Sequence, residues 1–588
     1  MTIVGISLGT TNSMITAYKG DRLIKIPNTF GEYLIPSVVS IDDDGTIYVG
    51  KTAKERMSTY PKVTFSHFKE FIGSDKCFAA NNKCYTAEEM ASFIIKALVD
   101  DARNYLGEEI TGAVIGVPVS FNNFQRQAVK LAGELAGVKV IRLINEPGAA
   151  ALGYRCQGDE EAIYMIFDMG GGILEVSMVA TSEDTIEVLA SVCEEHLGGD
   201  NFTEAIAEYF CSINSIKRSD LSPEEENMLL RKCEDIKLIL TEHTYGELAF
   251  TMREKTYILK LNEMQLIKIY AELLARVQKT VIRAVRDAEI PLERLKDIIL
   301  VGGGSKEPVV KNFLAKLTGV IPASPLKPEE IVAIGAGTIA GIEEGNHNLK
   351  NIVIKDICPF SLGVNIYNEG DPDNDMFSPI IERNSTLPCS KVNSYSTIKD
   401  NQRTISFKIY QGENIYCKDN VEIGSIQIDL PETPKGTRAA DVRFTYDISG
   451  ILEVEVVNVL TQEVTKEYLV SSANTMTEDE IQKRLEELQK IKVHPRKNVK
   501  NKHLIEWAKR LYQENTGEAR ELISNTLAYF ERALNNQEEF AIKSAYDYCY
   551  QALSMLDDTR DYFSIGDYLG DNDNQGAVRN GSTGGFLN

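Results

Sequence analysis

The stretch that decides the fold is Gly5-Ile6-Ser7-Leu8-Gly9-Thr10-Thr11-Asn12-Ser13, which interrupts an apolar run beginning at Thr2. Glycine has no Cβ, so backbone N–H groups can converge on an anion, and the hydroxyls of Thr10 and Thr11 add donors. The stretch therefore predicts a turn at the end of a strand that can hold a phosphate oxygen.

Two further glycine turns follow apolar runs of the same kind. Asp168-Met169-Gly170-Gly171-Gly172 comes after residues 162–167, and Val301-Gly302-Gly303-Gly304-Ser305 comes after residues 298–300. A single cluster of this kind is most simply a tight hairpin turn. Three in similar settings, the second with a carboxylate that can hold the waters of a Mg²⁺ ion, predict a nucleotide clamp. The Gly-x-x-x-x-Gly-Lys-Ser/Thr pattern does not accompany them, which excludes the P-loop NTPases.

Length and composition limit the class of protein to which the chain can belong. The 588 residues are too many for one core and predict three or four domains. The 43% hydrophobic and 25% charged residues indicate a mostly globular, soluble chain. A formal net charge of −23 would repel a phosphate backbone, so we expect no nucleic-acid partner. Because neither a signal peptide nor a bilayer-length apolar run is found, we expect no membrane partner and a cytoplasmic location.

The ten cysteines lie far apart and include no C-x-x-C pair that would indicate zinc binding or redox chemistry. Most of them are expected to be thiols in the core or on the surface, in a reducing compartment.

The residue pattern changes along the chain. Residues 1–350 alternate β-branched runs with helical segments, which indicates an α/β region, and its repeated strand, turn and strand suggest two lobes facing a cleft. Residues 351–357 form an apolar strip that is either a linker docking elsewhere or the first strand of the next domain. Residues 358–473 alternate as in a β-sandwich, and residues 474–562 have helical periodicity. The fold class is therefore multidomain, α/β followed by all-β and all-α, with a disordered tail over 563–588.

The helical region starts at a capping box formed by Thr477 and Glu480. Its apolar stripes at helical spacing indicate the core of a small bundle. A basic stretch at 490–502 is interpreted as a solvated loop, with a docking patch for an acidic partner as the less favoured alternative.

With these pieces in order, the chain resembles the seventy-kilodalton heat-shock chaperones, the DnaK family, from end to end apart from the tail. The resemblance is carried by the three glycine motifs and by Val117-Pro118-Val119-Ser120-Phe121-Asn122, Ile144-Asn145-Glu146-Pro147-Gly148-Ala149-Ala150-Ala151, Leu197-Gly198-Gly199-Asp200-Asn201-Phe202 and Ser361-Leu362-Gly363. The short lid with its His494-Pro495-Arg496 break is most similar to the bacterial HscC branch.

The resemblance implies an actin-like two-lobed nucleotide-binding domain (1–350), a docking linker (351–357), a β-sandwich peptide-binding domain (358–473) and a helical lid (474–562). It implies an ATP-dependent chaperone whose nucleotide state gates its affinity for extended apolar segments of unfolded proteins. The implied cofactors are ATP and Mg²⁺, with K⁺ as a further candidate. The implied partners are unfolded polypeptide and a J-domain co-chaperone, and the chain is expected to be a monomer. A small-molecule kinase on the same fold is disfavoured because it would need neither sandwich nor lid.

The resemblance also assigns residues of the nucleotide site. Lys69, Glu146 and Asp168 are the implied catalytic residues, with Asp168 holding the metal through water. Taken alone, Lys69 and Glu146 would be read as surface charges. The implied nucleotide contacts are Gly9, Thr10, Thr11, Asn12, Gly170, Gly171, Gly172, Gly199, Gly302, Gly303 and Gly304, with Glu234, Lys237 and Thr241 lining the adenosine pocket. Pro118 and Arg126 match the family's relay between nucleotide and interface.

For the peptide site, the resemblance implies a groove in the sandwich that holds extended chain by main-chain hydrogen bonds. Its implied lining is Val364, Tyr395, Ile405 and Phe407, with Tyr367 and Ile398 arching over the bound chain. By alternation alone, Val364 and Phe407 are equally well explained as ordinary inward-facing strand residues.

Four positions depart from the family pattern. Ser7 stands where an aspartate helps hold the metal, Ile173 replaces a threonine, Glu175 replaces an aspartate, and Leu238 sits where an arginine stacks on adenine. Loss of one well-placed electrostatic group costs about 3 kcal/mol in the transition state, a factor of roughly a hundred. We therefore expect a slow ATPase, and the alternative is a nucleotide-gated peptide-binding protein with little or no hydrolysis.

Overall fold

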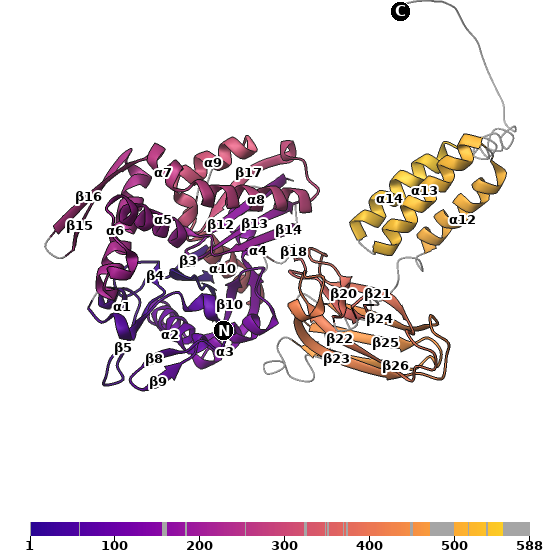
Figure 1. The fold of residues 1–588 in the computed structure, drawn as a ribbon, viewed down its shortest axis with the longest axis horizontal. Coiled ribbons are helices and arrows are strands. Elements are labelled where there is room, and N and C mark those ends of the chain that lie inside the picture. Colours follow the sequence, from indigo (N-terminus) through magenta and orange to yellow (C-terminus); the bar gives the residue numbers. More distant parts are fainter. Residues whose placement is uncertain are drawn as a thin grey trace, which may run out of the picture. The chain divides into compact units, whose positions relative to one another are not determined.

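The computed structural model describes most of the chain. The described residues are 2–20, 22–57, 59–155, 162–182, 185–252, 255–322, 326–346, 349, 352–368, 370–371, 374–446, 451–470, 499–515, 517–536 and 539–556. The chain divides into two compact units, Met1–Ile491 and Lys492–Asn588, which are described separately below (Figure 1).

The first lobe is built on a mixed sheet in the order β11-β10-β1-β2-β3, with β4 paired to β2. The apolar first strand, β1, is parallel to β10 and antiparallel to β2, so the first glycine stretch forms the turn between β1 and β2. Helices α2 and α3 start at capping boxes on Thr86 and Asn122 and bury their apolar faces in this lobe's core. The sheet strands are β1 (Thr2–Ser7), β2 (Asn12–Lys19), β3 (Arg22–Lys25), β4 (Ile35–Pro36), β10 (Ile110–Val117) and β11 (Val140–Asn145). The remaining elements are β5 (Val39–Ile41), β6 (Ile47–Val49), α1 (Lys51–Arg56), β7 (Thr64–Phe65), β8 (Phe78–Ala80), β9 (Lys83–Tyr85), α2 (Ala87–Leu106) and α3 (Asn123–Leu135).

The second lobe repeats this arrangement in the order β17-β12-β13-β14-β18. β12 is antiparallel to β13 across the second glycine turn and parallel to β17, as β1 is to β2 and β10. The third glycine turn follows β17 directly. The strands are β12 (Ala162–Met169), β13 (Ile173–Thr181), β14 (Thr185–Glu195), β15 (Tyr245–Met252), β16 (Lys255–Asn262), β17 (Leu295–Val301) and β18 (Val353–Lys355). The helices are α5 (Gly199–Ile213), α6 (Pro223–Glu242), α7 (Glu263–Ile269), α8 (Ala271–Asp287) and α9 (Pro308–Thr318).

Two helices, α4 (Glu146–Arg155) and α10 (Ile331–Glu343), cross at backbone contact distance. A Cβ on Gly335 would lie 1.9 Å from the Ala149 carbonyl oxygen, and one on Gly5 would lie 2.0 Å from the Gly337 nitrogen. Only glycine permits this approach, so these positions fix α10 against both α4 and β1.

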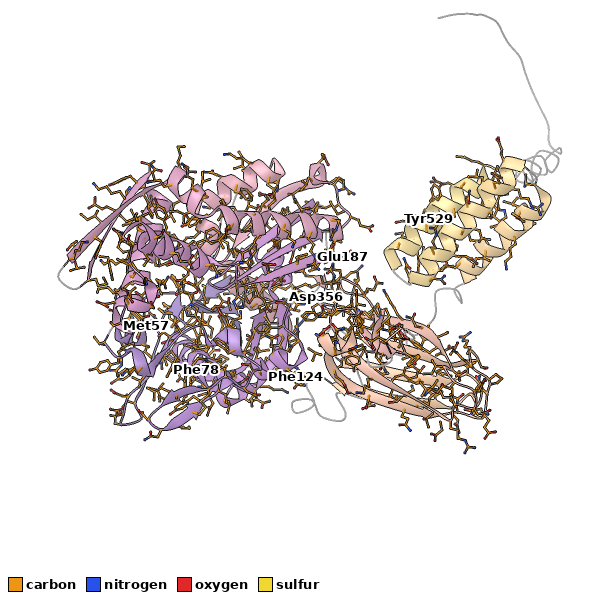
Figure 2. The ribbon with its side chains drawn as sticks, in the orientation of Figure 1. Met57, Phe78, Phe124, Glu187, Asp356 and Tyr529 are labelled. Carbon is orange, nitrogen blue, oxygen red and sulfur yellow. A yellow bond between two sulfur atoms is a disulfide. The ribbon has the colours of Figure 1, made fainter. Side chains whose placement is uncertain are left out.

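The apolar strip after the second lobe adds a strand to that lobe's sheet. β18 pairs in parallel with β14, with Ile354 opposite Ile186 and Lys355 opposite Glu187. Figure 2 labels Glu187 and Asp356, which lie close together where the strip meets β14. Residues 353–355 of the strip thus pair with the second lobe, and among the described residues they belong to neither sheet of the sandwich.

The sandwich consists of two four-stranded antiparallel sheets, β20-β19-β22-β23 and β21-β24-β25-β26 (Figure 1). Alternate residues of both sheets face a shared apolar core, as the period of two predicts. The multidomain fold class is thereby confirmed. The strands are β19 (Leu362–Ile366), β20 (Met376–Ile381), β21 (Cys389–Ser396), β22 (Thr404–Gln411), β23 (Val421–Asp429), β24 (Arg438–Tyr446), β25 (Ile451–Asn458) and β26 (Val464–Val470).

The second unit contains the helices α12 (Val499–Glu514), α13 (Gly517–Asn536) and α14 (Glu539–Ser554). Their apolar stripes form one core, in which the buried Trp507 ring meets the Tyr550 ring edge-on at 5.3 Å. The predicted capping box at Thr477, the predicted disordered tail and most of the basic stretch lie outside the described residues.

One cysteine pair differs from the expectation of thiols. Cys77 and Cys84 form a disulfide across the β8–β9 hairpin, while the other seven described cysteines are free and mostly buried. The spacing gave no signal for this bond, because the hairpin, rather than the sequence separation, brings the two residues together. Phe78 of the same hairpin, labelled in Figure 2, packs edge-on against Phe65 and Phe71.

Candidate functional site

The glycine turns of the two lobes meet in one place. The Gly199 N–H donates to the Gly170 carbonyl at 2.9 Å, and a Cβ on Gly304 would lie 2.9 Å from that same oxygen. From the first lobe, the Thr11 hydroxyl comes so close to Gly171 that a Cβ there would lie 2.3 Å from it. The structure therefore gathers the predicted phosphate-binding turns into one surface where side chains cannot intrude.

A buried ion pair lies next to these turns. Lys69 is on the short 3-10 helix Phe68–Phe71, and its Nζ lies 3.0 Å from Oε1 of Glu146, the first residue of α4. Lys69 is also 5.7 Å from the centre of the Phe121 ring. Two of the three predicted catalytic residues are thus in direct contact, and neither is a surface charge.

Asp168, the third predicted catalytic residue, lies in β12 and is close enough to Lys69 and Glu146 to interact with their charges. Burial, reinforced by the carboxylates of Glu146 and Glu175, raises the pKa of Asp168 well above its ordinary value, and Lys69 opposes this shift. Burial also raises the pKa of Glu175 to about 7, although the Ser191 hydroxyl and the Val119 N–H donate to its carboxylate. Glu146 and Asp168 therefore share the Lys69 ammonium group, while Glu175 adds a further carboxyl group beside them.

This excess of carboxylates fits a divalent cation. Mg²⁺ keeps several waters and is held by one or two carboxylates together with phosphate oxygens. Within the described residues, no three His, Cys, Asp or Glu side chains lie close enough to ligate one metal ion. The carboxyl groups gathered here are donors of the kind that Mg²⁺ takes alongside phosphate oxygens.

We expect the Glu175→Gln variant to lose stability less steeply as the pH rises. The pKa of Glu175 in the folded protein, about 7, is higher than in the unfolded chain. The contribution of Glu175 to the free energy of unfolding is therefore complete below about pH 4.5 and is lost as the pH rises through 7. In the wild type this amounts to at most ~3 kcal/mol. Melting temperatures of the nucleotide-free protein between about pH 5 and pH 8 measure the slope. Glu187→Gln, at the edge of the same sheet, should keep the wild-type slope, and an unchanged slope in Glu175→Gln would contradict the assignment.

An ionic contact that the sequence did not indicate joins the two lobes. His67 Nε2 lies 2.9 Å from Oδ2 of Asp200, and this hydrogen bond raises the pKa of His67. Glu70, two residues past Phe68, lies against Gly172, and burial raises its pKa. Single residues 133 positions apart carry no local pattern, so only the motif around Asp200 could have directed attention here.

The predicted adenosine residues lie along α6. Lys237 Nζ donates to the Gly199 carbonyl at 2.8 Å and lies 2.5 Å from Oε2 of Glu234, which ties α6 to the phosphate-binding turns. The Thr241 hydroxyl donates to the Leu238 carbonyl one turn further on, and the Leu238 side chain is exposed. The structure thus places a line of polar groups leading away from the turns.

Arg126 lies between the cluster around Glu146 and the docked strip. Its guanidinium donates to the Asn145 side chain at 2.6 Å and to the Phe121 carbonyl at 2.9 Å. Asn145 precedes Glu146 in the chain and also donates to the half-buried Asp356 carboxylate. Burial raises the pKa of Asp356, against the effect of this hydrogen bond and of Arg126. Contacts therefore run without a break from Lys69 to the strip, and Pro118 lies next to Val119, whose carbonyl also accepts from Arg126.

The predicted peptide-groove residues have mixed exposure. Val364 is fully buried and Phe407 is 2% exposed, as expected for ordinary inward-facing strand residues. The Tyr395 ring lies 5.3 Å from that of Phe407, and Tyr367 and Ile398 are exposed, at 40% and 37%. Ile405 packs at the margin of the core. Their role in peptide binding stays a prediction.

Comparisons with known proteins agree with this architecture. The chain matches the family model described as Hsp70 protein over residues 3–80 and 76–561. It is 33% identical over 603 residues to the chaperone protein DnaK of Thermosipho africanus, covering 98% of both chains. It is 33% identical to the chaperone protein dnaK of Cyanidioschyzon merolae, covering 86% of this chain and 88% of that protein. It is 35% identical to the chaperone protein DnaK of Thermotoga maritima, covering 82% and 83%.

The chain belongs to the Hsp70 family, and the predicted resemblance is confirmed. It is an ATP-dependent chaperone of the Hsp70 type, from a family of ATPase chaperones that bind ATP with Mg²⁺ and act on unfolded polypeptides. The comparisons give no support to the alternative with little hydrolysis, and the HscC branch stays a prediction. Among the described helices, none combines the length and the apolar character needed to cross a membrane.

Proposed function

We propose that this chain hydrolyses ATP slowly and uses Lys69, Glu146 and Asp168 to do so. The observation that carries the proposal is the buried Lys69–Glu146 pair beside Asp168, at the place where the glycine turns of both lobes meet. Ser7, at the end of β1, offers a hydroxyl in place of a further carboxylate, and Ile173 offers no hydroxyl. Fewer groups therefore hold the metal shell, which slows the reaction.

Each group of the cluster has a distinct role in the proposed reaction. The N–H groups of the turns at Gly171 and Gly303 cradle the phosphates. The Lys69 ammonium offsets charge that develops on the transferred phosphoryl group, and Glu146 holds that ammonium in place. Asp168 would hold Mg²⁺ through water, and the ion would supply charge neutralisation for the phosphates. K⁺ is proposed as a further cofactor.

Nucleotide binding is proposed to act on the sandwich through the docked strip. The sandwich would bind extended apolar segments of unfolded chains, and a J-domain co-chaperone would stimulate turnover. We further propose that the chain acts as a monomer in the cytoplasm. Support for the coupling comes from the contacts that link Glu146, Asn145, Arg126 and Asp356.

The Ser7→Asp variant tests the proposed cause of slow turnover. We expect its single-turnover rate of ATP hydrolysis with Mg²⁺ to exceed that of the wild type by roughly a hundredfold, because a carboxylate is restored to the metal shell. Ser74→Asp, which adds the same charge at an exposed position, should leave the rate unchanged. A wild-type rate at background together with a fast Ser7→Asp variant would instead favour nucleotide-gated binding without hydrolysis.

A further inference from the structure

A cavity of about 200 Å³ lies at the C-terminal end of α6, opposite the start of α9. Leu240, Thr241, Leu266, Glu307, Pro308 and Val309 line it. Both walls of the cavity are formed by segments that contact or directly follow the phosphate-binding turns. Lys237, bonded to Gly199, lies one helical turn before Thr241, and Glu307 is three residues past Gly304. A nucleotide with its phosphates on the turns and its sugar along α6 would therefore place its base at this cavity.

Glu307 is the unusual residue of this cavity. Its backbone N–H donates to the Gly304 carbonyl at 3.3 Å, which fixes the residue at the start of α9. The side chain is 4% exposed, and Oε1 is buried with no hydrogen-bond partner in the described part of the chain. The buried Tyr270 hydroxyl also has no partner there, and its pKa is raised by burial and by the nearby Glu307 charge. A buried carboxyl group without a partner is costly, which indicates a ligand that supplies one.

Burial raises the pKa of Glu307 to about 7, with Lys237 opposing the shift and Glu234 adding to it. The charged and titratable groups around it come from four places. They are Glu234 and Lys237 on α6, Glu242 and His243 at its end, Glu263 on α7, and Tyr270 between α7 and α8. Both protonation states of Glu307 are therefore accessible near neutral pH.

We propose that Glu307 contacts the hydrogen-bonding edge of the nucleobase and makes the preference for adenine over guanine depend on pH. This inference rests on the proposed nucleotide binding at the glycine turns. A neutral carboxyl group presents one O–H donor and one acceptor, which complements the N1 acceptor and the N6 amino donor of adenine. An ionised carboxylate presents acceptors alone, which complements the N1–H and N2 amino donors of guanine. Glu307 is thus a specificity-determining residue and takes no part in phosphoryl transfer.

Calorimetric titration of the full chain with ADP and GDP, in the presence of Mg²⁺, tests the proposal. At about pH 6 the wild type should prefer ADP, and the ratio of ADP to GDP affinity should fall about tenfold or more by pH 8. Glu307→Gln keeps a donor and an acceptor at every pH, so its preference for ADP should be the same at both. Glu272→Gln, which removes an exposed carboxylate in the first turn of α8 outside the cavity lining, should retain the wild-type pH dependence.

The possible outcomes distinguish a failure of this inference from a failure of the proposed nucleotide binding. If wild type binds ADP with a ratio to GDP that does not change with pH, or if Glu307→Gln changes as wild type does, Glu307 does not contact the base edge. The wild-type measurement alone can decide this, even if the variant folds poorly. If the wild type binds neither nucleotide at either pH, the proposed nucleotide site itself is wrong.

Discussion

Replacing Lys69 by alanine should lower the single-turnover rate of ATP hydrolysis by a factor of roughly a hundred or more. The Lys69 ammonium is the one cation within hydrogen-bond distance of Glu146 among the described residues. Its removal takes away the positive charge that offsets the carboxyl groups of Glu146 and Asp168. Radiolabelled ATP mixed with excess protein and Mg²⁺ gives the rate directly.

Binding must be measured alongside the rate for this variant. Because the glycine turns remain, we expect Lys69→Ala to bind ADP with an affinity within about tenfold of the wild type. Lys76→Ala removes a lysine that lies over the Phe71 ring on the exposed side of the same segment, and it should hydrolyse ATP normally. A Lys69→Ala variant with near wild-type turnover would remove Lys69 from the mechanism.

Replacing Asp356 by alanine should uncouple the two functions of the chain. Asp356 is half-buried at the end of the docked strip and accepts a hydrogen bond from Asn145, the residue before Glu146. A hydrogen bond to a charged group contributes about 1.5–3 kcal/mol, comparable to a typical coupling energy between sites. Dissociation of a fluorescent peptide should therefore accelerate on ATP addition in the wild type and about tenfold less in the variant.

The accompanying controls distinguish uncoupling from unfolding. Asp356→Ala should keep its basal hydrolysis and its peptide affinity without nucleotide, because neither site contains the residue. Lys355→Ala, which removes an exposed partner of Glu187 in the same strip, should release peptide as the wild type does. If Asp356→Ala responds fully to ATP, the contacts through Asn145 do not carry the signal.

The parts of the fold that could be predicted are those that depend on a local pattern of residues. The three glycine turns and the strands before them follow from short apolar runs, and the alternating residues of 358–473 follow from a period of two. The docking of residues 353–355 on β14 could not be decided, because parallel pairing joins segments distant in sequence and leaves no local signature.

The site residues also divide into those that a local motif predicts and those that it does not. Lys69 and Glu146 were found only through the motifs around them, since an isolated lysine or glutamate is most often a surface charge. The contact of His67 with Asp200 and the disulfide of Cys77 with Cys84 depend on how distant segments or hairpin strands are brought together. The burial of Val364 depends on which face of the strand meets the second sheet.

Because the sole tryptophan of the sequence lies in the helical unit, tryptophan fluorescence reports on that unit. Trp507 is packed against Tyr550 within the core of α12, α13 and α14, and the nucleotide-binding and sandwich regions contain no other indole. Emission excited at the red edge of the absorption band therefore comes from this unit alone. A spectral change on adding ATP would mean that the helices sense an event in the other unit, with no label attached.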